Sequence, residues 1–189
     1  MEVVRFTRSF LVLVVLTGAV ACSRARGEES TTGVREVSQP LPVLSGEDLR
    51  GNPLSSQDLE GHVLVVNTWA TWCTPCEREQ PALVQVADRY APLGVRFLGI
   101  NHADQLAAAQ EWVRRYDVPY PSLSDPSGRF AATLGYIGLP DTYVVDRSGT
   151  IRFVVTGPTD APQLSGLLDR VLADQASTSS ATAANSPAR

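Results

Sequence analysis

Residues 69–76 read WATWCTPC, and they follow the apolar stretch VLVVNT at residues 63–68. That stretch is rich in β-branched residues, which is typical of a strand buried on both faces of a sheet. After the cysteines, apolar residues recur at helical spacing over residues 83–90, so one face of a helix should pack on that sheet. Cys73 and Cys76 are therefore predicted to stand where a strand ends and a helix begins.

The rest of the chain alternates between strand-like and helix-like segments. The first part, residues 41–54, is split by glycines and a proline and predicts a short β-hairpin. Further predicted strands are residues 95–100, 121–123, 142–146 and 151–155, and further predicted helices are residues 105–116, 129–134 and 164–172. The order predicts an α/β fold with a mixed central sheet flanked by helices, the last two strands forming a hairpin.

Composition excludes some classes of partner. The 189 residues carry a net charge of −4, and every basic residue is an arginine, placed singly or in one pair. No basic stripe suggests nucleic acid. The size and hydrophobic content suit one globular domain, which we expect to be a monomer.

Residues 1–22 have the pattern of a signal peptide, because two arginines precede a twelve-residue apolar segment that is too short to cross a bilayer. The segment ends in AVAC at residues 19–22, which resembles a bacterial lipoprotein signal. That resemblance implies lipidation of Cys22 and an extracytoplasmic domain attached to the cell membrane. The alternative is ordinary cleavage after Ala21, which gives a secreted or periplasmic protein.

Two segments lack the pattern of a folded domain. Residues 23–38 are polar and are expected to form a flexible tether, and residues 175–189 form a Ser/Ala/Thr-rich tail that is expected to be disordered. The folded domain is accordingly placed at residues 39–174. We find no internal repeat.

The two cysteines could bind a metal, cross-link the fold or exchange electrons. A structural zinc site needs four nitrogen or sulfur ligands, and neither His62 nor His102 has ligand-like spacing; both are expected to be surface or loop residues. A disulfide across two intervening residues stabilises the fold very little. A helix N-terminus, however, stabilises a thiolate. We therefore expect Cys73 to face solvent and attack a foreign disulfide, and Cys76, one turn behind, to resolve the mixed disulfide.

A resemblance to a known family supports electron exchange. WATWCTPC, with VVNTW before it and CEREQPAL after it, resembles the membrane-tethered thioredoxin-like oxidoreductases of the TlpA, ResA and CcmG type. Residues 138–146, GLPDTYVVD, are similar to that family's Gly-Val-Pro-Thr-Thr-Phe segment. The resemblance implies a thioredoxin-like fold with an N-terminal β-hairpin and an extra β/α insertion. It also implies a cis Pro140 facing the CxxC, with Trp72, Leu139 and Pro140 binding substrate.

The same resemblance implies partners and a direction of electron flow. The partners would be exported proteins with paired cysteines, apocytochrome c among them, and a membrane electron donor. The Cys73–Cys76 disulfide would be the redox group, without another cofactor. Cytosolic thioredoxins carry a buried Asp where this chain has Asn67, whereas Glu79 matches a glutamate of the TlpA and ResA group. Glu79 is thus a candidate proton acceptor for Cys76, with a solvated helix charge as the alternative, and Glu77 is expected to be such a charge.

These features leave several functions open. Carboxylates near the thiols disfavour the thiolate, and a weakly stabilised thiolate favours a reductant. The first hypothesis is therefore an extracytoplasmic reductant of protein disulfides, in cytochrome c maturation. The alternatives are an oxidant that introduces disulfides, a copper-carrying lipoprotein, which the single Met and lack of His-rich sequence disfavour, and a peroxidase, for which WCTPC is the wrong cysteine context.

Overall fold

The computed structural model describes residues 33–184, with side chains described as far as residue 176. The helices and strands are β1 (Gly33–Pro40), β2 (Ser45–Glu47), β3 (Pro53–Ser55), β4 (Val63–Trp69), α1 (Thr74–Tyr90), β5 (Val95–His102), α2 (Leu106–Arg115), β6 (Ser122–Asp125), α3 (Arg129–Thr133), β7 (Asp141–Val145), β8 (Thr150–Thr156) and α4 (Ala161–Ala184), with short 3-10 helices at Ser56–Leu59 and Ala91–Leu93. From the N-terminal hairpin to α4, this is the predicted order of elements.

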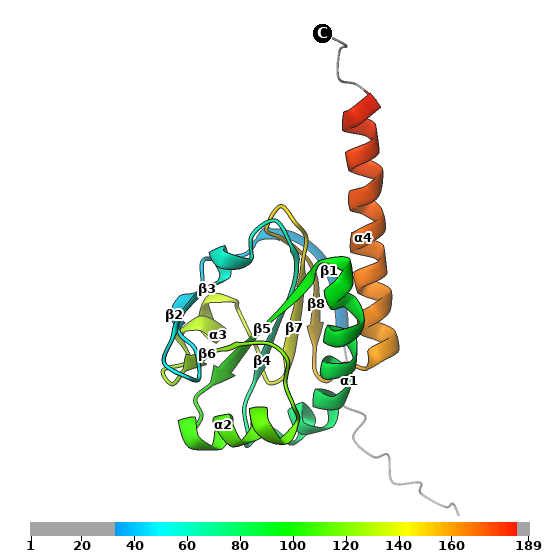
Figure 1. Cartoon of the computed structure of the whole chain (residues 1–189). Coiled ribbons are helices and arrows are strands. Elements are labelled where there is room, and N and C mark those ends of the chain that lie inside the picture. The colour runs from blue at the N-terminus through cyan, green and yellow to red at the C-terminus, as the bar shows by residue number, and fades with distance from the viewer. Residues whose placement is uncertain (1–32, 185–189) are drawn as a thin grey trace, which may run out of the picture.

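The strands form one six-stranded mixed sheet in the order β1-β8-β7-β4-β5-β6 (Figure 1). β4, β5 and β6 run parallel, as expected for strands joined through helices, whereas β7, β8 and β1 pair antiparallel. β2 and β3 form a separate two-stranded hairpin. The mixed sheet and the N-terminal hairpin confirm the predicted fold class.

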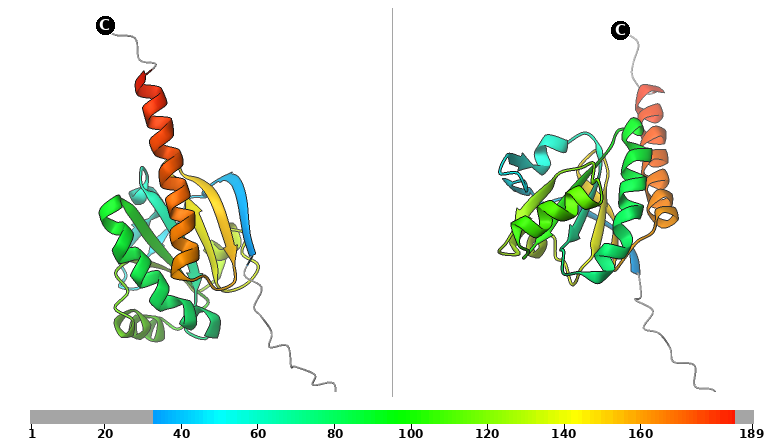
Figure 2. Two further views of the ribbon diagram at one scale, coloured as in Figure 1. Left: turned by 90° about the vertical axis from the view of Figure 1, so that its right-hand side faces the viewer. Right: turned by 60° about the horizontal axis from the view of Figure 1, so that its bottom comes forward.

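Both faces of the sheet are covered, because β4 is apolar on both sides. Val63 and Val65 belong to a core shared with α1 and α4, which lie side by side on one face (Figure 2). Leu64 and Val66 belong to a second core on the opposite face, which includes α3 and residues near the hairpin. Burying an aliphatic side chain of this kind stabilises the fold by about 1.5–3 kcal/mol. The two cores thus hold residues 63–66 of β4, and Trp69 at its C-terminal end belongs to a third cluster, which contains the cysteines.

The domain extends beyond the predicted limits at both ends. The expected tether at residues 23–38 is wrong for residues 33–38, since they belong to β1 and pair with β8. Most side chains of β1 are exposed, so this strand is stabilised by backbone pairing rather than by burial. For the same reason its sequence has no hydrophobic pattern that would predict a strand. The expected tail at residues 175–189 is wrong for residues 175–184, where α4 continues. Extending an existing helix needs no new nucleus, and this stretch contains alanine, the best helix former.

Residues 1–32 and 185–189 lie outside the described residues. The expectations for the signal peptide, for lipidation at Cys22 and for residues 23–32 of the tether therefore stay predictions. Within residues 33–184, no helix combines the length and the apolar character needed to cross a membrane.

Candidate active site

The cysteine loop joins the end of β4 to the start of α1. Cys73 is the residue that caps α1: its backbone is extended, with φ −91° and ψ 98°, and its Sγ accepts a hydrogen bond from the backbone N–H of Cys76 at 3.1 Å. Pro75 occupies the first turn, where its missing N–H leaves no partner unsatisfied. The predicted strand-to-helix junction is confirmed. One N–H that has no partner within the helix donates to the Cys73 sulfur.

The two cysteines form a disulfide, with 5.3 Å between their Cα atoms. Cys73 is 5% exposed and Cys76 is 1% exposed. The expectation that Cys73 faces solvent is therefore wrong in degree, although Cys73 is the more accessible of the two. The cause is an apolar cluster that encloses both cysteines and includes Trp69, Trp112 and Leu139. A substrate disulfide that reaches the sulfurs must approach through this apolar surround.

Two tryptophans form the wall behind the disulfide. The rings of Trp69 and Trp112 stack, with their centroids 5.4 Å apart. Each indole N–H has a buried partner, because Trp69 donates to the hydroxyl of Ser122 at 3.2 Å and Trp112 donates to the side-chain oxygen of Gln80 at 3.2 Å. Buried aromatic rings with satisfied polar atoms make a rigid wall. This wall links β4, α1, α2 and β6 around Cys76.

The segment before β7 lies against the cysteine cluster. Leu139 is half-buried and packs against the cluster that contains Cys73 and Cys76, and the peptide bond between Leu139 and Pro140 is cis, as the resemblance implies. The carbonyl of Pro140 accepts a hydrogen bond from the N–H of Gly157 at 2.9 Å. Trp72 is 60% exposed. Of the three predicted substrate-binding residues, Leu139 thus packs against the disulfide cluster and Trp72 offers the open apolar surface.

Glu79 is buried behind the cysteines rather than solvated. Its side chain accepts hydrogen bonds from the amide of Asn67 and from the backbone N–H of Thr159, each at 2.9 Å, and the residue is 2% exposed. Burial raises the pKa of Glu79 from 4.5 to about 7; the two hydrogen bonds oppose the shift, and the charge of Asp141 adds to it. A carboxyl group with this pKa can both accept and release a proton near neutral pH.

The neighbours of Glu79 explain two sequence features. Asn67 is not a base; it donates one hydrogen bond to Glu79 and another to the hydroxyl of Thr142 at 3.0 Å, which holds the carboxyl group in place. Glu77, in contrast, is exposed on α1 and accepts a hydrogen bond from the hydroxyl of Tyr116 at 2.9 Å. The exposure of Glu77 agrees with the expectation of a solvated helix charge. The burial of Glu79 excludes that alternative for Glu79.

Asp104 is a site residue that the sequence interpretation missed. Its carboxylate accepts hydrogen bonds from the backbone N–H of Thr71 at 2.6 Å, from the Thr71 hydroxyl at 2.7 Å and from the amide of Asn101 at 2.9 Å. These bonds lower the pKa of Asp104 and hold the loop two residues before Cys73. A signal existed: β4 and β5 are adjacent parallel strands, so the residues that follow each of them meet at the same edge of the sheet.

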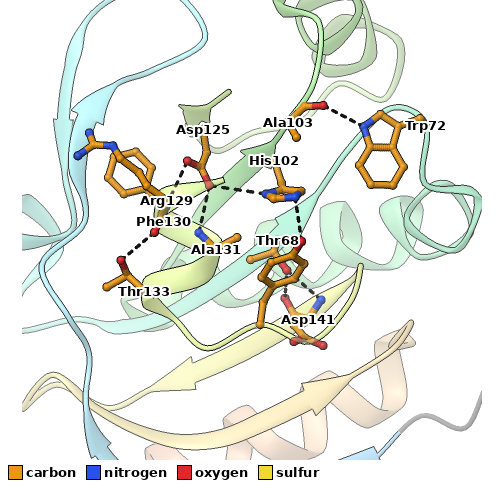
Figure 3. Close-up of polar contacts among 11 residues, drawn as sticks. Thr68, Trp72, His102, Ala103, Asp125, Arg129, Phe130, Ala131, Thr133 and Asp141 are labelled. Atoms are coloured by element: carbon orange, nitrogen blue, oxygen red, sulfur yellow. Dashed lines mark hydrogen bonds and ion pairs between the residues drawn. The ribbon is translucent and has the colours of Figure 1, made fainter. Parts of the chain in front are cut away.

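His102, in contrast, was considered in the sequence but was placed wrongly. It ends β5, and its side chain is only 12% exposed, whereas a surface or loop residue was expected. The imidazole lies on the Trp72 side of the site (Figure 3), with the two ring centroids 6.4 Å apart, and its Nε2 lies 2.9 Å from the hydroxyl of Tyr136. His62 is half-buried and directly precedes β4, at the end of that strand away from the cysteines. Among residues 33–184, no three His, Cys, Asp or Glu side chains are grouped as metal ligands would be.

A thioredoxin-like sheet with a CxxC disulfide at the start of a helix, a cis-proline segment beside it and a buried carboxyl group behind it defines a thiol–disulfide oxidoreductase. Such an enzyme exchanges electrons with other disulfides through a mixed disulfide. The comparisons with known proteins place the chain more narrowly. Residues 37–154 match the AhpC/TSA family, and the chain belongs to that family.

Two named relatives and one solved structure agree with this class. The thiol-disulfide oxidoreductase ResA of Bacillus cereus is 28% identical over 161 residues, which cover 85% of this chain and 93% of the relative. The thiol:disulfide interchange protein DsbE of Pseudomonas aeruginosa is 38% identical over 127 residues, or 66% of this chain and 68% of the relative. A thioredoxin family thiol:disulfide interchange protein from Chlorobium tepidum superimposes with a TM-score of 0.65 at 31% identity, covering 73% of this chain and 99% of that one. The chain is thus an oxidoreductase of the ResA and DsbE type.

Proposed function

We propose that this oxidoreductase works outside the cytoplasm as a reductant of protein disulfides, and that its substrates include the haem-attachment cysteines of apocytochrome c. Cys73 attacks one sulfur of the substrate disulfide, and the other substrate sulfur leaves as a thiolate. Cys76 then loses its proton and attacks Cys73, which releases the second substrate thiol. Two electrons pass to the substrate, and the enzyme ends as the Cys73–Cys76 disulfide.

The observation that carries the proposed direction is the buried carboxyl group of Glu79. It follows Cys76 by three positions on α1, which places the two side chains on the same face of the helix. With a pKa of about 7, Glu79 is partly ionised at neutral pH, and its negative charge disfavours a thiolate on the same face. A weakly stabilised thiolate makes the dithiol a better reductant, and Glu79 can take the proton that Cys76 must lose.

One contact supports the opposite direction, an oxidant. The Cys76 N–H donates to the Cys73 sulfur at 3.1 Å, and such a bond stabilises a Cys73 thiolate and with it the reduced enzyme. The reduction potential of the Cys73/Cys76 couple decides between the two directions. We expect equilibration with glutathione or dithiothreitol, read by alkylation and mass spectrometry, to give a value near −270 mV, the thioredoxin value, rather than about −120 mV. A value above about −180 mV would reverse the direction.

Export and anchoring form a separate part of the proposal. The apolar segment before Cys22 supports a lipoprotein signal, and a lipid anchor would place the enzyme near a membrane electron donor. Incorporation of labelled palmitate tests this. We expect label in the parent protein and none in Cys22→Ser, and an unlabelled parent that is cleaved after Ala21 would show secretion without an anchor. The redox chemistry of Cys73 and Cys76 does not depend on this result.

A further inference from the structure

His102 is the point at which four separate segments of the chain meet. It is the last residue of β5, and its imidazole faces the cysteine loop, the start of α3 and the segment that leads to Pro140 (Figure 3). Gly128 leaves the room for the ring, because a Cβ at that position would lie 2.7 Å from Cε1 of His102. Any residue larger than glycine at position 128 would therefore clash with the imidazole in this position.

The surroundings define how the imidazole carries its proton. Nδ1 is buried without a hydrogen-bond partner and lies 3.8 Å from the Oδ2 atom of Asp125, whose side chain is fully buried. That carboxylate also accepts the backbone N–H groups of Phe130 at 3.2 Å and Ala131 at 3.1 Å. The negative charge favours a proton on Nδ1. Nε2 is then free to accept a hydrogen bond from the hydroxyl of Tyr136, which lies 2.9 Å away.

Through these contacts, His102 connects two sides of the active site, the cysteine loop at Trp72 and the segment that leads to Pro140. On one side, the rings of Trp72 and His102 meet edge to face, with their centroids 6.4 Å apart, and the Trp72 indole N–H donates to the carbonyl of Ala103 at 3.2 Å. On the other side, Tyr136 begins the segment that continues through Ile137 to the cis peptide bond at Pro140. Trp72 and Ile137 are 60% and 81% exposed.

We propose that His102 is a positioning residue that, through Tyr136, fixes the Trp72 side of the active site relative to the cis-proline segment. The two exposed apolar side chains, Trp72 and Ile137, then contact an extended stretch of the substrate protein on either side of its disulfide. Because His102 holds the Trp72 side and the cis-proline segment in place, its loss should lower the affinity for a protein substrate. A small disulfide contacts only the sulfurs, so its reaction should not depend on the position of these two sides.

The test compares a protein disulfide with a small disulfide. Insulin reduction is followed under dithiothreitol turnover, and the small-disulfide rate is measured in a single turnover of pre-reduced enzyme, freed of dithiothreitol, with dithionitrobenzoate, for the parent, Tyr136→Phe and His102→Leu. We expect the KM for insulin to rise roughly three- to tenfold in both variants, the range given by the loss of one hydrogen bond, while kcat and the rate with the small disulfide stay unchanged. His102→Gln, which keeps a polar group near the Nε2 position, should restore most of the affinity.

Tyr90→Phe is the matched control. It also removes a tyrosine hydroxyl bonded at 2.7 Å to an aspartate, Asp169, but at the opposite end of α1 from the cysteines, and it should leave both KM values unchanged. If His102→Leu does not fold, Tyr136→Phe decides, since it removes one hydroxyl from a half-buried side chain. An unchanged KM for insulin in Tyr136→Phe overturns the proposal. Equal losses with both substrates also overturn it, because they would place His102 in the chemistry at the sulfurs.

Discussion

Replacing Glu79 by glutamine should remove a specific pH dependence from the stability of the fold. The pKa of this carboxyl group is 4.5 in the unfolded chain and about 7 in the folded protein. Below pH 4.5 the group is protonated in both states. Between these values the unfolded chain releases the proton and the folded protein keeps it, so the free energy of unfolding falls as the pH rises and levels off above about pH 7.

The size of the effect follows from the shift. Each pKa unit corresponds to about 1.4 kcal/mol, so the ionisation of Glu79 lowers the free energy of unfolding by at most about 3 kcal/mol between pH 4.5 and about pH 8. Glutamine is neutral throughout this range, and the fall should disappear. Glutamine also has one acceptor oxygen instead of two, so it leaves either Asn67 or Thr159 without its hydrogen bond, at about 1–3 kcal/mol independent of pH.

The assay is urea unfolding of the oxidised protein, followed by tryptophan fluorescence at a series of pH values. Glu77→Gln is the matched control, because it removes a neighbouring carboxylate of the same helix that is exposed. We expect the parent and Glu77→Gln to share one slope, and Glu79→Gln to lack it. Parallel curves for the parent and Glu79→Gln would refute the assignment of a raised pKa to Glu79. In the reduced protein, alkylation rates against pH should shift more in Glu79→Gln than in Glu77→Gln.

Three further changes test other parts of the site. Cys76→Ser should accumulate a mixed disulfide with substrate on non-reducing gels and Cys73→Ser should not; trapping by Cys73→Ser instead would exchange their roles. Asp104→Asn should lower the free energy of unfolding by about 1–3 kcal/mol near neutral pH. The parent should lose this contribution as the pH falls below 3.8, the value in the unfolded chain, toward the lower pKa of the folded protein. Gly99→Ala would place a Cβ within 2.8 Å of an indole nitrogen and should cost about 1–3 kcal/mol by thermal unfolding, whereas Gly166→Ala, where nothing lies within 4 Å, should not destabilise the fold.

The parts of the fold that could be predicted are those with a local signature. β4 is a continuous apolar segment because both of its faces are covered, and the helix that follows keeps one apolar face, so the pattern alone placed Cys73 and Cys76 at their junction. The turn at residues 147–150 likewise indicated the hairpin of β7 and β8. In each case neighbouring residues determine the structure, so the sequence carries the information within a short window.

The parts that could not be predicted depend on pairs of residues far apart in the chain. β1 forms by pairing with β8, more than a hundred residues later, and its own side chains have no apolar pattern. The burial of Glu79 depends on Thr159, and the enclosure of His102 depends on Gly128 and Tyr136. Helical spacing put Glu79 on the face of Cys76, but only the tertiary structure shows that this face is closed.

The pairing of β1 also determines at which end of the domain the chain before Gly33 joins it. Gly33 pairs with Thr156, and Thr156 pairs with Asp141, the residue after Pro140, so the start of β1 lies two strands, or about 10 Å, from the cis-proline segment. α4 runs away from that end and projects past the opposite side of the sheet (Figure 1). A tether before Gly33 would therefore hold the catalytic end toward its attachment point, and we expect a purification tag or fluorophore to disturb substrate access least when it is fused after α4.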